Sequence, residues 1–444
     1  IDVPPTLVSF ALAPGNTKQV VSPEFKEVGS LISFIEVPRD ENQLPNFGTL
    51  KEIAATLHGA NILAAHTLDH GGIATGLSKM AFGNGIGANI QTDINLHQER
   101  FLSFLIESKE EIDGGIVIGR TQIEPTIQVG SETLKLGELY DAWTSPLAEI
   151  YPETEDPSTS EADTFTSTFE SKRSTTKTKN PKVIIPAFPG TNSEYDSAKA
   201  FGEVGAQAEI QVFRNLTPQA VEESLSNLAK SIRKSQILML PGGFSAGDEP
   251  AGSGKFIATI LRSPEVADAV MDLLKNRDGL ILGICNGFQA LIKTGLVPYG
   301  EIREPQPGDP TLTFNDIGRH IARYATTRIS STQSPWLADT QVGDLHNIPF
   351  SHGEGKFYAN KEDLRKLAAT GQIATQYTDL NGQPTMAPDF NPNGSIHAIE
   401  GISSPCGRVL GKMGHTERQG PDVGKNISGN LYQPLFRAGV KYFS

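Results

Sequence analysis

The chain has 444 residues and a formal net charge of −13 at pH 7. This length allows two or three domains with full cores, and the acidic balance argues against a nucleic-acid-binding scaffold, which would carry basic patches. Its 2 cysteines exclude a disulfide-rich secreted framework and fit a reducing compartment. Because we find no signal peptide and no apolar run that would span a bilayer, we expect a cytoplasmic protein with no membrane partner.

The first residues, Ile1 to Pro5, do not read as a natural start, so we expect a processed chain or a fragment. Further on, Ala64 to Ala74 has the form of a strand, a turn with Asp69-His70-Gly71-Gly72, and a helix. The glycine pair fits either a tight structural turn or a loop that holds a metal or phosphate. Residues 83–87, with three glycines, are expected to form a tight turn first and a ligand loop second.

A change of composition divides the chain. Residues 152–180 carry Pro152, Pro157 and many Ser, Thr, Glu and Lys residues, with almost no aliphatic ones. Such a segment cannot bury enough apolar area to fold alone. We therefore expect residues 152–180 to be a linker between two domains, residues 1–151 and 181–444.

The second half alternates short apolar strands with helices. Its predicted strands are residues 183–186, 208–213, 236–240 and 279–284, and its predicted helices are residues 194–204, 218–228 and 266–274. This alternation predicts an α/β fold with a doubly wound, mostly parallel sheet of the flavodoxin-like kind. Ligands of such sheets bind beyond the carboxyl ends of the strands. Three of these ends carry glycine-rich turns, at Pro189-Gly190, at Pro241-Gly242-Gly243 and around Cys285.

The turn at Cys285 is the most informative of the three. An apolar strand leads into Gly283-Ile284-Cys285-Asn286-Gly287, and a helix follows. This is the layout of a nucleophile elbow, in which flanking glycines allow a strained backbone and close helix packing. The helix N-terminus also favours the thiolate form of the cysteine. We therefore predict that Cys285 is a nucleophile.

A cysteine nucleophile requires a base, and the base requires an orienting group. The sequence offers two His-x-Glu pairs, His352 with Glu354 and His415 with Glu417. In an extended segment, residues i and i+2 project to the same side, so either pair can set a carboxylate beside an imidazole. Spacing alone does not choose between them.

Three motifs in this half resemble a known family. Phe188 to Asp196, Leu240 to Asp248 and Gly283 to Gln289 are similar to the glutaminase domain of phosphoribosylformylglycinamidine synthases, which are triad-type (class I) glutamine amidotransferases. The resemblance covers about residues 181–444. In this family, the triad His and Glu come from a late His-x-Glu-Arg motif whose middle residue is usually Pro, and the matching segment here is His415 to Arg418, with Thr416 at the middle.

The resemblance implies a mechanism and assigns residues to it. The Cys285 thiolate would attack the side-chain amide of glutamine, His415 would act as general base and then general acid, and Glu417 would orient His415. Backbone N–H groups of Gly243 and Asn286 would hold the oxyanion, and Gln289, one turn beyond Cys285, would hold the substrate glutamine. Ser351 to Gly355 resembles a second family motif, so His352 is expected to have a pocket or interface role. No metal ligand is expected.

The first half resembles the end of the synthetase region in the long, single-chain form of the same enzyme. Pro4 to Phe10 and Ala64 to Ala74 carry this resemblance, although His70 stands where the family usually has an acidic residue before the glycine pair. The resemblance implies a trailing strand and an α+β subdomain of the ATP-binding, aminoimidazole-ribonucleotide-synthetase-like type. It also implies that the intact enzyme uses ATP, Mg2+ and glutamine to convert formylglycinamide ribonucleotide to its amidine in purine synthesis, together with an N-terminal remainder of the polypeptide.

Two other function classes stay open from the sequence. One is another cysteine hydrolase or amidotransferase on the same sheet. The other is a non-catalytic regulatory module, against which the intact set of Cys285, His415 and Glu417 argues.

Overall fold

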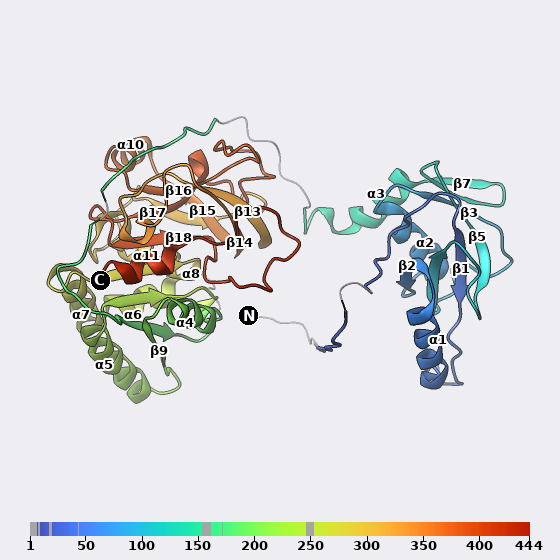
Figure 1. The fold of residues 1–444 in the computed structure, drawn as a ribbon, viewed down its shortest axis with the longest axis horizontal. Helices are drawn as coiled ribbons and strands as arrows, with labels where there is room; N and C mark the ends of the chain where they lie inside the picture. Colours follow the sequence, from blue (N-terminus) through green and yellow to red (C-terminus); the bar gives the residue numbers. More distant parts are fainter. Residues whose placement is uncertain are drawn as a thin grey trace. The chain divides into compact units, whose positions relative to one another are not determined.

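The structure is a computed structural model that describes residues 7, 9–16, 20–42, 44–152, 161–170, 172–245 and 253–444. It divides into two compact units, Ile1–Tyr151 and Pro152–Ser444 (Figure 1), called unit 1 and unit 2 below. Most of the segment Pro4 to Phe10, residues 153–160 and 171 of the expected linker, and residues 246–248 of the second glycine-rich motif lie outside the described residues.

Unit 1 contains, within its described residues, a seven-stranded sheet in the order β2-β4-β1-β5-β3-β6-β7. Neighbouring strands are antiparallel except β3 and β6, which are parallel. Its elements are β1 Leu31–Ile35, α1 Phe47–Gly59, β2 Ile62–Thr67, α2 Gly72–Phe82, β3 Gly87–Ile90, β4 Phe104–Ser108, β5 Ile116–Gln122, β6 Thr126–Val129, β7 Glu132–Lys135 and α3 Leu136–Ala148.

The glycine pair in unit 1 has a structural reason. The predicted strand–turn–helix junction is present as β2, the turn at residues 68–71 and α2. Gly71 and Gly72 have φ angles of +82° and +62°, which favour glycine. A Cβ on Gly72 would stand 2.3 Å from the carbonyl oxygen of Gln98. Residues 83–86 form the expected tight turn, between α2 and β3.

Unit 2 contains, in its described part, a nine-stranded sheet in the order β14-β13-β16-β17-β18-β11-β10-β8-β9. Strands β9, β8, β10, β11 and β18 are parallel, and the pairings from β18 through β17, β16 and β13 to β14 are antiparallel. The parallel strands are β8 Lys182–Ala187, β9 Gln207–Val212, β10 Ile237–Leu240, β11 Leu280–Ile284 and β18 Val409–Lys412. The antiparallel ones are β13 Ile321–Ile329, β14 Leu345–His352, β16 Ile373–Tyr377 and β17 Ile399–Ser403.

The prediction of a mostly parallel sheet is therefore correct for one half only, and the whole sheet is mixed. The four strands predicted from sequence are β8, β9, β10 and β11, and all four are parallel. The antiparallel half follows Cys285 in the chain, where the sequence analysis assigned no strands. A small two-stranded sheet pairs β12 Thr311–Phe314 with β15 Glu354–Tyr358.

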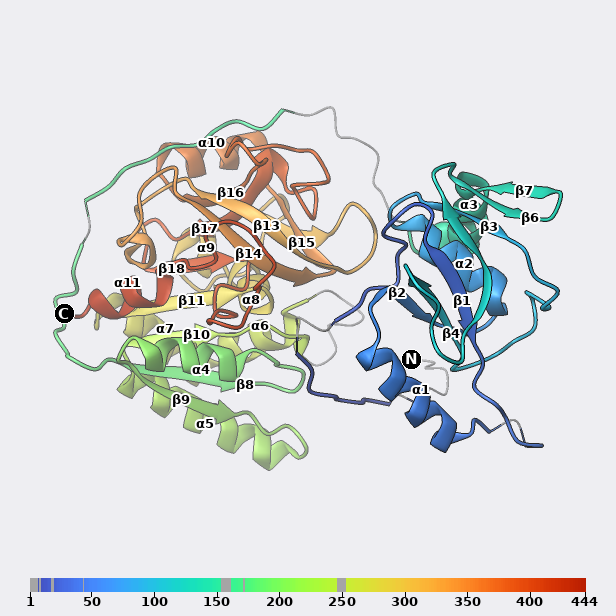
Figure 2. The same ribbon diagram turned by 45° about the vertical axis from the view of Figure 1, so that its right-hand side comes forward.

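Helices flank the parallel half, as expected for a doubly wound sheet (Figures 1 and 2). Helix α5 contacts α7, α6 contacts α8, and α4 contacts α11. The helices of unit 2 are α4 Glu194–Glu203, α5 Pro218–Lys234, α6 Lys255–Arg262, α7 Pro264–Lys275, α8 Asn286–Thr294, α9 Leu296–Tyr299, α10 Lys361–Ala369 and α11 Leu435–Lys441.

The segment expected to be a linker is fastened to unit 2 along its described length. Residues 161–180 contain no helix or strand, as the composition indicated, but they run over the outside of unit 2 (Figures 1 and 2). The backbone N–H groups of Asp163, Phe165 and Thr178 donate to His397 Nδ1, Gln376 Oε1 and the carbonyl of Phe443, at 3.2, 3.0 and 2.9 Å. The segment, called the strap below, therefore gains its order from unit 2 rather than from its own apolar side chains.

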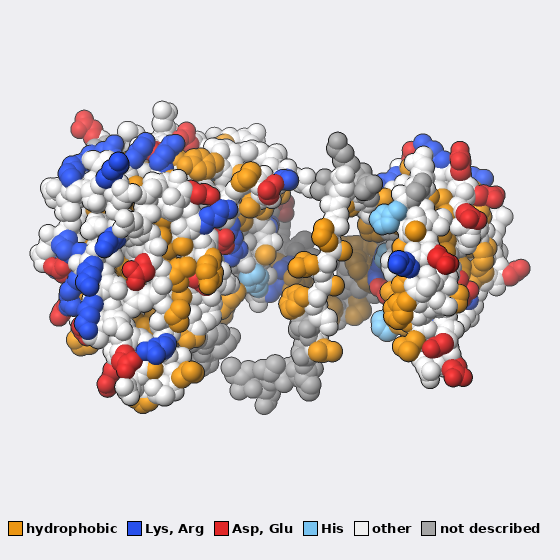
Figure 3. Space-filling model, turned by 60° about the horizontal axis from the view of Figure 1, so that its bottom comes forward, with side chains coloured by type: hydrophobic (Ala, Val, Ile, Leu, Met, Phe, Trp, Pro, Cys, Tyr) orange, Lys and Arg blue, Asp and Glu red, His pale blue; other side chains and the backbone are white. Residues whose placement is uncertain are grey.

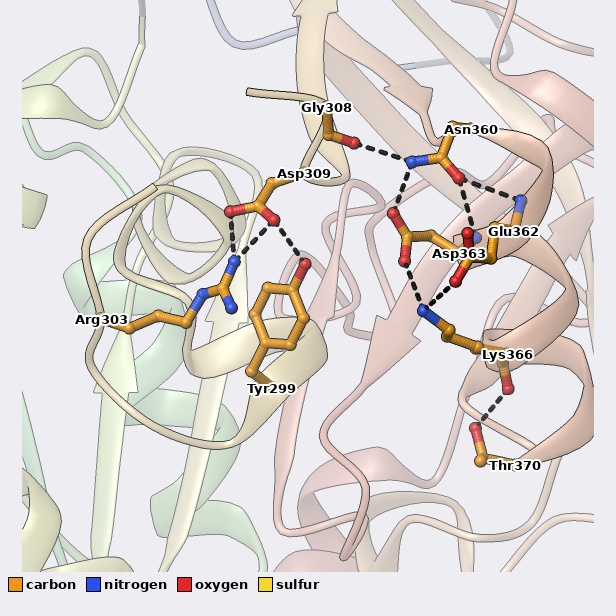
Figure 4. Close-up of polar contacts among 9 residues, drawn as sticks. All are labelled: Tyr299, Arg303, Gly308, Asp309, Asn360, Glu362, Asp363, Lys366 and Thr370. Atoms are coloured by element: carbon orange, nitrogen blue, oxygen red, sulfur yellow. Dashed lines mark hydrogen bonds and ion pairs between the residues drawn. The ribbon is translucent and has the colours of Figure 1, made fainter. Parts of the chain in front are cut away.

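A polar cluster fixes the loop between α9 and β12 (Figure 4). The Arg303 guanidinium lies 3.7 Å from the centre of the Tyr299 ring, and Asp309 accepts hydrogen bonds from both side chains. Burial and the hydrogen bond to Asp309 raise the pKa of Tyr299. On the other side of this loop, Asn360 caps α10 and donates to the carbonyl of Gly308 at 3.0 Å. None of these residues is among the site residues expected from the sequence, and their contacts fix the position of the loop.

Two findings concern surfaces and membranes. Among the described residues, no helix is long and apolar enough to cross a membrane. On the face drawn in Figure 3, both basic and acidic side chains occur on each unit.

Candidate active site

Cys285 stands between β11 and α8 with a strained backbone. Its φ and ψ are 51° and −106°, a positive-φ conformation that non-glycine residues rarely adopt. Gly283 and Gly287 permit this turn because a Cβ on Gly287 would stand 2.0 Å from the carbonyl oxygen of Leu240, and one on Gly283 would stand 2.8 Å from Gly287. The predicted elbow geometry is thus present, with Cys285 at the N-terminus of α8.

The Cys285 thiol is 4 % exposed and lies between β14 and the end of β18. Its Sγ donates to the carbonyl oxygen of Ser351 at 3.5 Å, and its backbone N–H donates to the carbonyl of Lys412 at 2.9 Å. The sulfur is also close enough to His415 to influence the charge of that imidazole. Among the described residues, His415 Nε2 has no hydrogen-bond partner, so this ring nitrogen is available to the thiol.

His415 and Glu417 form a buried pair. His415 Nδ1 lies 2.6 Å from Glu417 Oε1, and the two side chains are 1 % and 0 % exposed. Burial alone would lower the pKa of His415, but the Glu417 carboxylate and the Cys285 sulfur outweigh it and raise that pKa to about 9. Burial would raise the pKa of Glu417, and the neighbouring His415 instead holds it below its ordinary range. The pair therefore favours a protonated imidazole beside an ionised carboxylate.

The raised pKa makes the stability of this pair depend on pH. A group whose pKa is higher in the folded state contributes stability that is fully present below its unfolded pKa, here 6.5, and lost as the pH rises through about 9. We expect Glu417→Gln, which removes the carboxylate, to lower the melting temperature most near pH 6.5 and progressively less toward pH 9. Thermal denaturation of both proteins at pH values spanning this range measures the difference. A difference that grows as the pH rises would contradict the assigned pair.

The second His-x-Glu pair, His352 and Glu354, does not form a contact like that between His415 and Glu417 in the hydrogen bonds described. His352 is 1 % exposed, and its Nδ1 and Nε2 face the side chains of Asn315 and Asn393 at 3.1 and 3.5 Å. Burial and the nearby His415 lower the pKa of His352 to about 3, which keeps the imidazole neutral. The carboxylate of Glu354 instead accepts the backbone N–H of Ser253 at 2.9 Å. The structure thus sets a carboxylate behind His415 and an amide behind His352.

Gly243 and Asn286 flank the elbow from two sides. Gly243 has a φ of +147°, pairs with Thr191 in an isolated bridge, and its neighbour Gly242 packs against the His415 ring. A Cβ on Gly242 would stand 2.6 Å from His415 Cε1. Asn286 opens α8, and its side chain accepts the backbone N–H of Ser245 at 3.2 Å. Both predicted oxyanion donors therefore lie on the turns that meet at Cys285 and His415.

Gln289 is buried, at 3 % exposed, and its amide is occupied within the protein. Its Oε1 accepts from Asn286 Nδ2 at 2.9 Å, and its Nε2 donates to the carbonyl of Glu354 at 2.5 Å. In this structure Gln289 therefore joins α8 to β15, with one acceptor site of its Oε1 and one hydrogen of its Nε2 used by these bonds.

Sequence reasoning missed two groups beside the site. The carbonyl of Ser351, which accepts from the Cys285 thiol, belongs to the motif at residues 351–355, but backbone acceptors leave no signal in a sequence. Lys412 is 1 % exposed at the end of β18, three residues before His415. Its signal was present as a lysine within the apolar run from Val409 to Met413, where an unpaired charge would be costly.

The second cysteine is in a different environment. Cys406 belongs to the turn after β17, and its sulfur lies 3.5 Å from Ser404 Oγ. Burial would raise the pKa of its thiol, but Ser404 and Arg408 lower it. It has neither an elbow backbone nor a histidine among these neighbours, so only Cys285 has the surroundings of a nucleophile.

Known proteins resemble this chain in sequence over more than half of its length. The subunit PurQ of phosphoribosylformylglycinamidine synthase from Aquifex aeolicus is 31% identical over 242 residues, which is 54% of this chain and 92% of that protein. The PurQ subunit from Symbiobacterium thermophilum is 34% identical over 263 residues, or 59% of this chain and 96% of that protein. Among solved structures, PurLQS from Thermotoga maritima matches 60% of this chain and 96% of that chain, with 23% identity and a TM-score of 0.41.

The family match covers all of the elements that build the site. Residues 180–443 match the family described as the CobB/CobQ-like glutamine amidotransferase domain. This range begins two residues before β8 and includes the elbow, both His-x-Glu pairs and α11. The chain therefore belongs to the glutamine amidotransferase family of the CobB/CobQ-like type.

Proposed function

We propose that this chain hydrolyses the side-chain amide of glutamine through a Cys285 thioester. His415 is the general base and then the general acid, and Glu417 orients the His415 ring. The observation that carries the proposal is the juxtaposition of a positive-φ cysteine with a buried imidazole that has a carboxylate 2.6 Å behind it.

The steps conserve atoms and charge. His415 takes the proton of the Cys285 thiol as general base. The resulting thiolate attacks the amide carbon of glutamine and forms a C–S bond, while the carbonyl π electrons move to oxygen. His415 then gives its proton to the amide nitrogen, the C–N bond breaks, and ammonia leaves a γ-glutamyl thioester. Water, deprotonated by His415, attacks this thioester, and the C–S bond breaks to release the carboxylic acid and return the thiolate beside the protonated His415. The acid then gives its proton to the released ammonia, which leaves glutamate and ammonium.

The oxyanion requires donors that are in place before the reaction. Backbone N–H groups of Gly243 and Asn286 have this role in the proposal, since both belong to turns that border Cys285 and His415. Helix α8 adds its N-terminal dipole at the same point. Gln289 contributes by accepting from Asn286 and, in the proposal, by contacting the substrate glutamine.

The relatives suggest where the ammonia goes. PurQ is named as a subunit of phosphoribosylformylglycinamidine synthase, so we propose that ammonia from this chain converts formylglycinamide ribonucleotide to its amidine in de novo purine synthesis. Unit 1 would then be the end of a synthetase region, as the motif from Ala64 to Ala74 suggests, and the N-terminal remainder of a long single chain would supply the rest.

In the proposal the intact enzyme uses ATP and Mg2+ for that reaction, and the described residues of unit 1 do not form a magnesium site by themselves. Among the described residues, no three His, Cys, Asp or Glu side chains gather as metal ligands. In the glycine-pair loop, Asp69 is paired with Lys79 at 3.0 Å, and His70 is paired with Glu99 at 3.0 Å. We derive no step through ATP or Mg2+, and the glutaminase steps proposed above use only side chains and backbone groups of unit 2.

The proposal is tested by trapping the thioester. The full chain is mixed with glutamine, quenched in acid, and digested for mass spectrometry of the peptide that contains Cys285. A γ-glutamyl adduct on Cys285, with equal release of ammonia and glutamate at steady state, supports the proposal. Turnover with the adduct on Cys406, or with no adduct while Cys285 is blocked by iodoacetamide, would overturn it.

A further inference from the structure

A buried lysine lies directly behind the turn that carries His415 and Glu417. Lys412 Nζ donates to the carbonyl oxygen of Gly414 at 3.0 Å and to Thr416 Oγ1 at 2.8 Å. Gly414 precedes His415, and Thr416 stands between His415 and Glu417 in the chain. One ammonium group therefore holds the turn on both sides of the imidazole.

Glu400 on β17 completes this arrangement from the neighbouring strand. Its Oε1 lies 3.5 Å from Lys412 Nζ and accepts the backbone N–H of Gly414 at 2.6 Å. The Thr375 hydroxyl donates to the other carboxylate oxygen. Because Glu400 and Lys412 are 0 % and 1 % exposed, each charge depends on the other and on these hydrogen bonds.

The far side of the turn is fixed as well. Thr416 Oγ1 donates to Gln433 Oε1 at 2.8 Å, and the His415 N–H donates to the carbonyl of Pro349 at 2.9 Å. Gly414 leaves no room for a side chain, since a Cβ there would stand 2.8 Å from Ile348. The turn from Gly414 to Glu417 is therefore bounded by β14, β17 and β18. Among the contacts described above, Lys412 is the charged side chain that donates hydrogen bonds to it.

A buried ion pair is weak support for stability, because a well-packed apolar pair would serve as well. An apolar side chain at position 412 would pack against the same strands, but it would offer no donor to Gly414 and Thr416. In this chain the Thr416 hydroxyl and the Lys412 ammonium hold the same turn by hydrogen bonds.

We propose that Lys412, with Glu400 as its counter-charge, is a positioning residue that holds the turn from Gly414 to Glu417 so that His415 faces both Cys285 and Glu417. This inference rests on the proposed function, since it assigns a support to the proposed base. The charged and titratable groups that face His415 are Cys285, Glu417 and His352, and those that face Lys412 are Glu400 and His346.

The first test uses a matched pair at the hydroxyl. Thr416→Ser keeps the oxygen that accepts from Lys412, whereas Thr416→Val keeps the shape and removes it. We expect Thr416→Ser to retain the glutaminase rate and Thr416→Val to lose about tenfold in kcat, with KM for glutamine nearly unchanged. The reason is that the ring orientation affects the chemical step rather than substrate binding.

The second test removes the ammonium without stranding a charge. Lys412→Met combined with Glu400→Gln leaves no unpaired ion, and we expect a loss of about a hundredfold in kcat because the base is no longer held in place. Tyr442→Phe is the control, since it removes a 2.8 Å hydrogen bond to Asp278 in a different part of unit 2. It should lower the melting temperature and leave kcat unchanged.

A pH profile separates positioning from a general loss of structure. Two quantities are measured as a function of pH in a Cys406→Ser background: kcat for glutamine, and the rate at which iodoacetamide alkylates Cys285, followed by mass spectrometry. In the Lys412 double variant and in Thr416→Val, the His415 proton should be lost at lower pH, so the alkaline limb of the kcat profile should shift down. Thr416→Ser and Tyr442→Phe should keep the profile of the parent protein.

The outcomes distinguish the two proposals. Equal losses in Thr416→Ser and Thr416→Val, or parental kcat and pH profiles in both Thr416→Val and the Lys412 double variant, overturn the positioning role. If the double variant does not fold, the Thr416 pair decides together with Gln433→Met, which removes only the acceptor of the Thr416 hydroxyl and should keep the parental kcat and pH profile. If alkylation of Cys285 in the parent protein leaves glutamine hydrolysis intact, the proposed function fails instead, whatever the variants do.

Discussion

Cys285→Ser is expected to abolish glutamine hydrolysis. A serine hydroxyl at this position would have to lose a proton of far higher pKa than that of a thiol, and the site offers an ion pair suited to a thiolate. Removing a nucleophile from a triad costs on the order of 10⁴-fold or more in kcat. Serine is nearly isosteric with cysteine and can occupy the same elbow, so the melting temperature should change little.

The measurement pairs two activities of the complete enzyme. Glutamine-dependent synthesis of the amidine should disappear in Cys285→Ser, whereas synthesis with added ammonium salt should survive, because free ammonia bypasses the glutaminase step. Near-parental glutamine turnover by Cys285→Ser would contradict the assignment of Cys285 as the nucleophile. Loss of both activities would instead point to a folding defect, which the melting temperature reports.

His415→Ala should have the second largest effect. The substitution removes the group that accepts and returns the proton, and we expect no acyl-enzyme and a loss of several kcal/mol in barrier terms, as for other triad knockouts. It also leaves the Glu417 carboxylate buried without its partner, so the protein should be less stable. The double variant His415→Ala with Glu417→Gln removes this unpaired charge and should recover stability but not activity.

His352→Ala is the matched control because this histidine is equally buried and lies one residue from the carbonyl that contacts Cys285. Its ring faces two asparagines and is neutral, so thioester formation should continue, although entry of substrate can be disturbed. The assay is rapid-quench detection of the Cys285 adduct in both variants. An adduct in His415→Ala and none in His352→Ala would reverse the assignment of the base.

The parallel half of unit 2 could be predicted from sequence because buried parallel strands read as continuous apolar runs. Ile237–Leu240 and Leu280–Ile284 are buried at every position, and their boundaries followed from the glycines and polar residues beside them. Strand β16 is equally buried but includes Thr375 and Gln376, whose side chains bond Glu400 and the strap. Such a strand does not show an apolar pattern, and its partners are far away in the chain.

The site could be predicted in part for a similar reason. The elbow at Cys285 depends on local backbone geometry, which Gly283 and Gly287 report directly. The choice between His415 and His352 as the base depends on which side chain contacts the far nitrogen of each ring. Spacing does not distinguish them, because each histidine is followed by a Glu two residues later. Asn315 and Asn393, which occupy the ring nitrogens of His352, come from loops that only the folded chain brings there.

The strap has a consequence for how unit 2 is isolated. Within residues 161–180, Ser174 and Thr175 donate to Asp278 Oδ2 at 3.1 and 2.9 Å, and Asp278 Oδ1 accepts from Tyr442 at 2.8 Å. The composition suggests a boundary before residue 181, and the family match begins at residue 180. A truncation that begins at residue 181 would remove Ser174 and Thr175, which donate to this carboxylate, and Phe165, which packs against the core. A fragment made to contain the proposed glutaminase should therefore start at residue 161, because the strap makes contacts across unit 2 before strand β8 begins.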